Sequence, residues 1–169
     1  MASWNQDPSA DAPGALGKVL LVDDEPELRR VVRRHLIKAG FEVLEAPNGR
    51  VALELALQGE LDVVVSDVRM PDMGGLELVE RLSEQAPELP VVLVSGCSGF
   101  ADAGTALAYG VVGCLAKPVD LDQLIASVSF AVGIRRGLLK RVDVPRDSET
   151  RLAVASTDRL GSRRLGSGA

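Results

Sequence analysis

The feature of this chain that most constrains its fold is a repeated alternation of short apolar runs with segments of helical spacing. The runs lie at residues 18–22, 41–46, 61–66, 90–95 and 112–116. Most are rich in valine and lack polar alternation, which is typical of strands covered on both faces. Parallel neighbours of this kind need crossover connections, and the intervening helices supply them. The sequence therefore predicts an α/β fold, a doubly wound five-stranded parallel sheet, (βα)5, with helices on both faces.

The segments between these runs carry the helical signal. In the first of them an apolar face recurs at i, i+3, i+4 and i+8. Its members are Leu28, Val31, Val32 and Leu36. The opposite face is basic and is formed by Arg29, Arg30, Arg33 and Arg34. Further helices are predicted near residues 51–56, 76–82 and 100–109, and from Asp120, which suits an N-cap.

Polar side chains follow four of the predicted strands at their carboxyl ends. They are Asp23 and Asp24, Asp67, Ser95, and Lys117. Ligands of doubly wound folds bind outside the carboxyl ends of the strands, so these side chains are expected to converge on one edge of the sheet. Carboxylates that follow buried strands are costly to bury unless they are paired or bind a cation.

The expected cluster suits phosphoryl transfer. Magnesium prefers oxygen ligands and commonly uses one or two carboxylates together with a phosphate. A lysine can neutralise charge on a phosphoryl group, and a hydroxyl can donate a hydrogen bond to it. We therefore expect Asp67 to attack the phosphorus of a donor beside Mg²⁺ (or Mn²⁺), with Lys117 and Ser95 binding the phosphoryl oxygens.

Four segments carry a resemblance to a known family. They read VLLVDDEPELRRVVRRHL, VVVSDVRMPDMGGLELVERL, LPVVLVSG and GCLAKPVDLDQL, and the aspartate that precedes an R-M-P-x-M-x-G-x-x-L turn is the most specific feature. Over residues 18–135 the chain resembles the receiver domain of response regulators in bacterial two-component (phosphorelay) systems. The resemblance implies a flavodoxin-like fold and a signalling switch rather than an enzyme with an external substrate. It also implies phosphorylation by a histidine kinase, a phosphotransfer protein or a small phosphodonor.

The same resemblance assigns the acidic residues. It implies that Asp67 is the phospho-acceptor and also a metal ligand. Asp24 would be a direct magnesium ligand, and Asp23 would act mostly through a water molecule. The backbone carbonyl of Arg69 would complete the protein's share of the coordination.

The resemblance further makes Ser95 the switch hydroxyl and Lys117 the phosphate-binding lysine, with a cis bond between Lys117 and Pro118. One position departs from the family pattern. Receiver domains usually carry Tyr or Phe three residues before the lysine, as a rotamer switch, and this chain has Cys114 there. Tyr109 lies five residues earlier and is not assumed to replace it.

Simpler explanations exist for each residue taken alone. Asp23 and Asp24 would serve as the N-cap of the first helix, and Asp67 would cap the turn into the third. Lys117 would form an ordinary surface ion pair. His35 lies among arginines and a lysine on a solvated helix face, and no helical hairpin that would make it a phospho-histidine surrounds it.

Two other functions stay open. An aspartate-nucleophile phosphatase of the haloacid-dehalogenase type also combines Asp, Ser or Thr, Lys and magnesium. It requires a D-x-D motif after the first strand, whereas Asp23 and Asp24 are adjacent and Asp67 follows the third. The other alternative is a pseudo-receiver, an interaction module that no longer switches, and Cys114 keeps it open.

Composition limits the class of protein. The formal net charge is −5, with 24 acidic residues against 19 lysines and arginines, so the chain lacks the basic excess of a nucleic-acid binder. Cys97 and Cys114 have neither zinc nor disulfide spacing and are predicted to be buried free thiols. The N-terminus has no secretion-signal pattern, and no apolar run approaches the roughly 20 residues that cross a bilayer. We expect a cytoplasmic protein without a membrane partner.

The ends of the chain differ in composition from the receiver region, 18–135. Residues 1–17 are predicted to be a disordered lead-in. Apolar residues beyond the fifth helix predict a helical extension to about Arg141, as a linker or a homodimer contact, although Gly133 and Gly137 weaken it by about 1 kcal/mol each. The rest of 136–169 is predicted to be a linker or tail. It either ends a stand-alone receiver or leads to an output domain that this sequence does not include.

Overall fold

The fold is built on a five-stranded parallel sheet in the order β2-β1-β3-β4-β5. The computed structural model describes residues 14–96 and 111–139. The strands are β1 (Lys18–Val22), β2 (Glu42–Ala46), β3 (Val63–Asp67), β4 (Val91–Ser95) and β5 (Val111–Ala116). The helices are α1 (Pro26–Lys38), α2 (Gly49–Gln58), α3 (Gly75–Gln85) and α5 (Leu121–Arg135). The doubly wound parallel α/β fold is confirmed, and the helix predicted over 100–109 lies outside the described residues.

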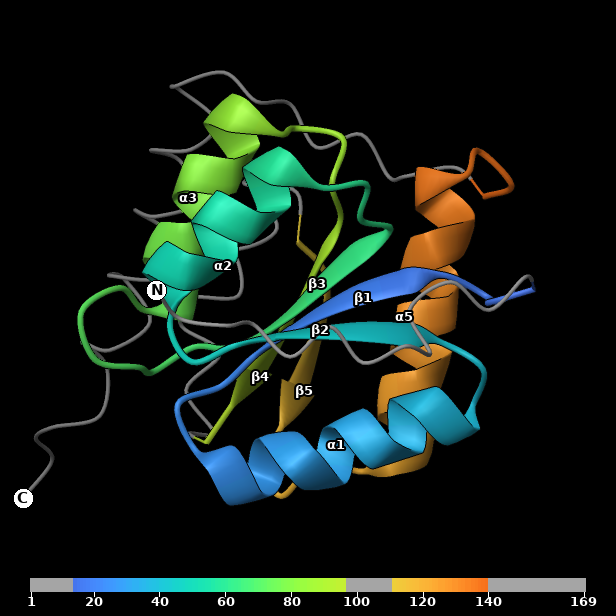
Figure 1. Ribbon diagram of the computed structural model, residues 1–169, viewed down its shortest axis with the longest axis horizontal. Helices are drawn as coiled ribbons and strands as arrows, with labels where there is room; N and C mark the ends of the chain where they lie inside the picture. Colours follow the sequence, from blue (N-terminus) through green and yellow to red (C-terminus); the bar gives the residue numbers. More distant parts are fainter. Residues whose placement is uncertain (1–13, 97–110, 140–169) are drawn as a thin grey trace, which may run out of the picture.

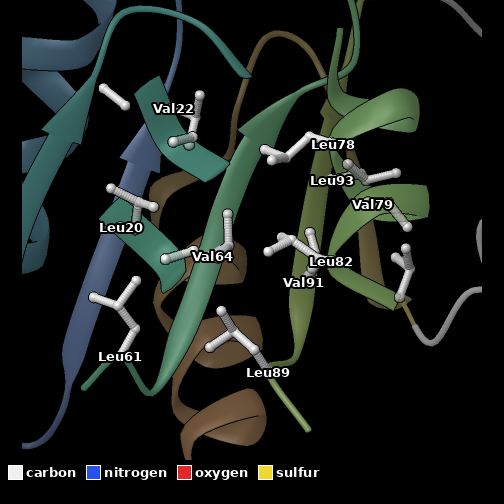
Figure 2. Packing of buried hydrophobic residues seen from close by; sticks show 14 residues of the cluster. Leu20, Val22, Leu61, Val64, Leu78, Val79, Leu82, Leu89, Val91 and Leu93 are labelled. Carbon is white, nitrogen blue, oxygen red and sulfur yellow. The ribbon is translucent and has the colours of Figure 1, made fainter. Parts of the chain in front are cut away.

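Helices cover both faces of the sheet (Figure 1). The helices α2 and α3 pack on one face, where the buried cluster includes Leu20, Val64 and Leu78 (Figure 2). The helices α1 and α5 pack on the other face, over a second cluster that includes Val19 and Val65. Neighbouring residues of one strand therefore point into opposite clusters, which explains why the runs that form β1 and β3 are apolar without alternation. No helix in the described parts of the chain is long and apolar enough to cross a bilayer.

The strand order reverses between β1 and β3. From β1 the chain first moves outward to β2 and then returns to β3 on the other side of β1. The two crossover helices that leave β1 and β3 lie on opposite faces, so a crevice opens between the carboxyl ends of these two strands. Asp23 follows β1 there, and Asp67 is the last residue of β3.

The start of α3 packs tightly against the end of β3. Ser66 is fully buried, and its hydroxyl donates to the backbone carbonyl of Asp67 at 2.9 Å. A Cβ atom on Gly75 would overlap with that same carbonyl and would lie 3.1 Å from Ser66 Oγ. A side chain at Gly75 is therefore incompatible with this helix position, and the backbone of Asp67 is held between the strand and α3.

The prediction for the buried face of α1 is wrong at one position and incomplete at another. Val32 and Leu36 are buried, whereas Val31 is 47% exposed. Arg29, which was predicted to lie on the face opposite the apolar one, has a side chain that is only 18% exposed. The helix lies so that β2 and the loop after β1 cover the side that bears Arg29, which periodicity alone did not indicate.

The ends of the described chain differ from the predicted boundaries. Residues 1–13 lie outside the described residues. The lead-in was predicted to include residues 1–17, but its last two residues, Leu16 and Gly17, are bonded to the domain. Leu16 donates its amide to the Gly40 carbonyl at 2.9 Å, and the Gly17 carbonyl accepts the amide of Glu42 at 2.9 Å. A Cβ atom on Gly17 would lie 2.9 Å from a methyl group of Val132 in α5. This segment therefore belongs to the domain.

The predicted helical extension is wrong for the described residues, which end at residue 139. The helix α5 ends at Arg135, and Gly137 takes a left-handed φ of 70°. The amides of Leu138 and Leu139 turn back to the Gly133 carbonyl at 2.9 and 3.1 Å, which closes the last turn. Gly137 therefore ends the helix, and residues from 140 onward lie outside the described residues.

We predict that Gly75→Ala lowers the free energy of unfolding by about 1 to 3 kcal/mol, the usual range for overpacking a close contact. The added methyl group must displace either α3 or the carbonyl of Asp67. Chemical denaturation of both proteins would measure the difference. Gly113→Ala is the matched control, because a Cβ atom there would make only ordinary contacts at 3.7 Å or more. Equal effects of the two substitutions would contradict this account of the junction.

Candidate functional site

The acidic residues converge as the sequence predicted. Asp23, Asp24 and Asp67 each offer a carboxylate oxygen, and these oxygens lie within 4.8 Å of one another. Asp23 and Asp67 are buried, at 6% and 7% exposure, whereas Asp24 is exposed. The cluster lies at the carboxyl ends of β1 and β3, where the strand order reverses.

Lys117 supplies the positive charge of this cluster. Its Nζ lies 2.6 Å from Asp67 Oδ2, 3.5 Å from Asp23 Oδ2 and 3.8 Å from Glu25 Oε1. Burial of the ammonium group would lower its pKa. The hydrogen bond to Asp67 and the charges of Asp23 and Asp67 outweigh burial, and the pKa of Lys117 is raised above its ordinary value. Lys117 is therefore charged at neutral pH and belongs to the site rather than to a solvent-exposed surface pair.

Asp23 is held in place by its neighbours. Its Oδ1 accepts the amide of Glu25 at 2.7 Å, and Glu25 is the N-cap residue of α1 without a side-chain cap bond. Asp23 and Asp24 therefore do not cap the helix. Burial raises the pKa of the Asp23 carboxyl, and the negative charge of Asp67 adds to this effect. The Glu25 amide and Lys117 offset part of the increase.

Asp67 also has no capping role. The N-cap of α3 is Gly74, which lies well beyond the strand end. The Asp67 carboxylate instead accepts the amide of Arg69 at 3.2 Å on one oxygen and the Lys117 ammonium on the other. The carboxylate is thus directed into the acidic cluster, and the role of the Arg69 carbonyl as a metal ligand stays a prediction.

Ser95 ends β4 directly beside Lys117. The Ser95 carbonyl accepts the Lys117 amide at 2.7 Å, and Ser95 pairs in register with Ala116. Lys117–Pro118 is a cis peptide bond, in agreement with the prediction from the sequence. The structure therefore brings Ser95 to the same edge of the sheet as the lysine, and the switching role of its hydroxyl stays a prediction.

Cys114 occupies the position at which receiver domains usually carry an aromatic residue. It lies in β5 opposite Leu93, is partly buried, and packs against the cluster under α2 and α3. It is a free thiol, and burial raises its pKa. Cys114 therefore fills space as a small apolar residue. Cys97 and Tyr109 lie outside the described residues.

His35 takes no part in the site. Its Nδ1 lies 2.8 Å from the Val31 carbonyl, one turn earlier on α1. This local contact agrees with the simple helix-surface reading of the sequence.

The donor set fits a divalent cation. A hard cation such as magnesium requires oxygen ligands and retains water molecules, so it needs carboxylates with access to solvent. Asp23 and Asp67 supply buried oxygens, and Asp24 supplies an exposed one at the mouth of the cluster. Burial is the main cause of the raised pKa of Asp23. A bound cation would stabilise the ionised carboxylate.

Sequence reasoning missed Arg29, whose guanidinium contacts the loop that carries the acidic pair. Its Nη1 donates to the backbone carbonyl of Asp23 at 2.6 Å, and its Nε donates to Glu45 at 3.1 Å. The sequence offered one indication, which is that Arg29 lies two residues after Glu27, near the start of the helix and close to the acidic loop. Because the predicted helix has several arginines on that face, nothing distinguished Arg29 from the others.

Comparison with known proteins gives a consistent result. The model of the response regulator receiver domain matches residues 19–129. The chain is 36% identical over 149 residues to the C4-dicarboxylate transport transcriptional regulatory protein DctD of Pseudomonas aeruginosa, covering 88% of this chain and 31% of that protein. It is 36% identical over 116 residues to the DNA-binding transcriptional regulator NtrC of Escherichia coli, covering 69% of this chain and 25% of that protein. The chain thus spans about a third or less of the length of these curated relatives.

Solved receiver domains share the fold. The receiver domain of the Francisella response regulator 1452 matches with a TM-score of 0.65 at 28% identity, over 69% of this chain and 96% of that chain. The chemotaxis response regulator CheY4 of Vibrio cholerae matches with a TM-score of 0.63 at 33% identity, over 68% and 98%. Sequence and fold agree, and the chain belongs to the response regulator receiver domains of two-component systems, a family of phospho-acceptor signalling switches.

Proposed function

We propose that this domain is phosphorylated on Asp67 in a magnesium-dependent reaction and that the phosphoryl group controls a separate output. The observation that carries the proposal is the 2.6 Å contact between Lys117 Nζ and Asp67 Oδ2 inside a cluster of three carboxylates. An aspartate in this position is both a nucleophile and half of an ion pair. Phosphorylation would therefore change the contacts of the lysine directly.

In the proposed reaction, a carboxylate oxygen of Asp67 forms a bond to the phosphorus of the donor. The bond from phosphorus to the donor's nitrogen (a phosphohistidine) or oxygen (acetyl phosphate) breaks, and the donor leaves with that electron pair. A magnesium ion held by Asp23, Asp24 and Asp67 would supply charge neutralisation for the transferring group. Lys117, which is charged at neutral pH, would bind a phosphoryl oxygen.

The donor of the phosphoryl group is a histidine kinase or a phosphotransfer protein, as the family implies. Cys114 has no aromatic ring to change rotamer, so we assign the response to Lys117 and Ser95. Relatives such as DctD and NtrC are transcriptional regulators, so the output of the complete protein is proposed to be transcriptional control. A pseudo-receiver that docks without switching is the alternative, and it predicts no response to a phosphodonor.

The first prediction concerns the acceptor. Incubation with magnesium and acetyl phosphate should add the mass of one phosphoryl group to the intact protein, and Asp67→Asn should abolish this gain because an amide cannot attack phosphorus. Mass spectrometry of the intact chain would measure it. Asp72→Asn is the matched control, since Asp72 is an exposed carboxylate in the loop between β3 and α3. Labelling that survives in Asp67→Asn would place the acceptor elsewhere, and sustained release of phosphate from phosphomonoesters would favour the phosphatase.

The second prediction concerns Asp23 and metal removal. Because the pKa of Asp23 is raised in the folded state, its ionised carboxylate lowers the free energy of unfolding. This stability is lost as the pH rises through the folded-state pKa. In buffer with a chelator at neutral pH, Asp23→Asn should therefore raise the free energy of unfolding. Magnesium should then stabilise the wild type more than the variant.

Thermal unfolding with and without magnesium would measure both effects. Glu84→Gln is the matched control, because it removes the same charge from an exposed position on α3. Two outcomes would show that the cation site is not where we propose it. One is that Asp23→Asn lowers the stability of the protein in the presence of a chelator. The other is that magnesium stabilises Asp23→Asn as much as it stabilises the wild type.

A third prediction concerns self-association through the fifth helix, now without the extension. Phe130 lies on α5 with 46% of its surface exposed. If α5 forms a homodimer contact, Phe130→Glu should shift the protein towards monomer in sedimentation velocity runs with magnesium and beryllofluoride. Leu57→Glu is the matched control, since Leu57 is 47% exposed on α2. A wild type that stays monomeric at all concentrations would remove this partner from the proposal.

A further inference from the structure

Arg29 makes an unusual set of contacts for a residue on the basic side of α1. Its Nη1 donates to the backbone carbonyl of Asp23 at 2.6 Å, and its Nε donates to Glu45 Oε1 at 3.1 Å. Its side chain is 18% exposed. By contrast, the neighbouring Arg30 has a side chain that is 72% exposed, and it pairs with Glu27 on the same helix at 2.7 Å. Arg29 therefore joins three elements, namely α1, β2 and the loop after β1.

The contact to Asp23 completes the anchoring of that residue. The Asp23 amide donates to the Ala46 carbonyl at 3.3 Å, and its Oδ1 accepts the Glu25 amide at 2.7 Å. The Arg29 guanidinium holds the remaining backbone group, the carbonyl. A charged donor makes this hydrogen bond stronger than a bond between neutral groups. The peptide groups on both sides of the Asp23 Cα atom and one oxygen of its carboxylate are thus all hydrogen-bonded.

The charge of Arg29 is balanced outside the acidic cluster. Glu45 on β2 accepts Arg29 at 3.1 Å through Oε1 and pairs with Arg33 Nε at 3.3 Å through Oε2. The guanidinium binds a backbone carbonyl and Glu45, whereas Lys117 contacts the carboxylates. Arg29 can therefore fix the loop and leave the carboxylate oxygens of Asp23 available to a cation.

We propose that Arg29 is a positioning residue for the divalent-cation site, acting through the backbone of Asp23 and anchored by Glu45. The inference rests on the proposed cation site. Three carboxylates within 4.8 Å repel one another, so a loop that bears two of them needs an external restraint to stay in binding geometry. Residues that orient a metal ligand typically change metal affinity by about 10-fold to 100-fold when they are replaced.

Positioning and simple electrostatics predict opposite effects of Arg29→Ala. Removal of a positive charge near the carboxylates makes the local potential more negative, which alone would strengthen the binding of a cation. Loss of the restraint on Asp23 would weaken it. The sign of the change in magnesium affinity therefore separates the two explanations.

The experiment is a magnesium titration of the full chain, followed by NMR or calorimetry, for the wild type, Arg29→Ala, Arg29→Lys and Arg30→Ala. We expect the Kd for magnesium to rise about tenfold in Arg29→Ala and to change less than about twofold in Arg30→Ala. Arg30→Ala is the matched control, because it removes the same charge one residue away. Arg29→Lys should restore part of the affinity, since one ammonium can reach the carbonyl but lacks the planar fork that also binds Glu45.

Three outcomes separate the possibilities. If the wild type binds no magnesium, the proposed function fails at its cation site and this inference fails with it. If the wild type binds magnesium but Arg29→Ala binds equally well or more tightly, the positioning role alone is overturned. Circular dichroism would show whether Arg29→Ala is folded. If it is not folded, the magnesium affinity of the conservative Arg29→Lys is compared with that of the wild type instead. An affinity equal to that of the wild type would then overturn the inference.

Discussion

The contact between Lys117 and Asp67 is the interaction on which this site depends. Three carboxylates lie within 4.8 Å of one another, two of them buried, and their mutual repulsion opposes the fold. The lysine lowers that repulsion from one side, at 2.6 Å from Asp67. The pKa of Asp23 is still raised, because burial outweighs the effects of the Glu25 amide and Lys117. An incompletely neutralised pocket is less stable than a neutral one and is suited to a cation and a phosphoryl group.

The scaffold brings these charges together through strand order and close packing. Because β1 and β3 are adjacent although β2 lies between them in the sequence, the residues that follow them meet at one crevice. The surrounding contacts limit movement of Asp23 and Asp67. Gly75 lets α3 approach the carbonyl of Asp67, and Arg29 holds the carbonyl of Asp23. Both contacts act on the backbone, so they orient the carboxylates without occupying them.

Most of the fold could be predicted, because valine-rich runs and helical spacing are local signals. The bounds of β1 were predicted in full, and those of β2, β4 and β5 differ by one residue at the start. The strand β3 begins two residues later and ends one residue later than predicted. The failures have specific causes. Periodicity gives the direction of a side chain around a helix but not how far a neighbouring element covers it, so Val31 and Arg29 were assigned to the wrong environments. The apolar residues that predicted a helical extension continue past Gly137, which takes a left-handed conformation and ends the helix.

The sequence by itself determined which residues stand at the strand ends, because that depends only on the order of apolar runs and polar residues. It also determined that they would meet, since parallel strands share one edge. Tertiary structure decided the pairing: Lys117 binds Asp67, 50 residues earlier, and Arg29 binds a backbone carbonyl that carries no sequence signal. Such contacts depend on the distances between elements that are separate in the sequence. Only the packing of the folded core sets those distances.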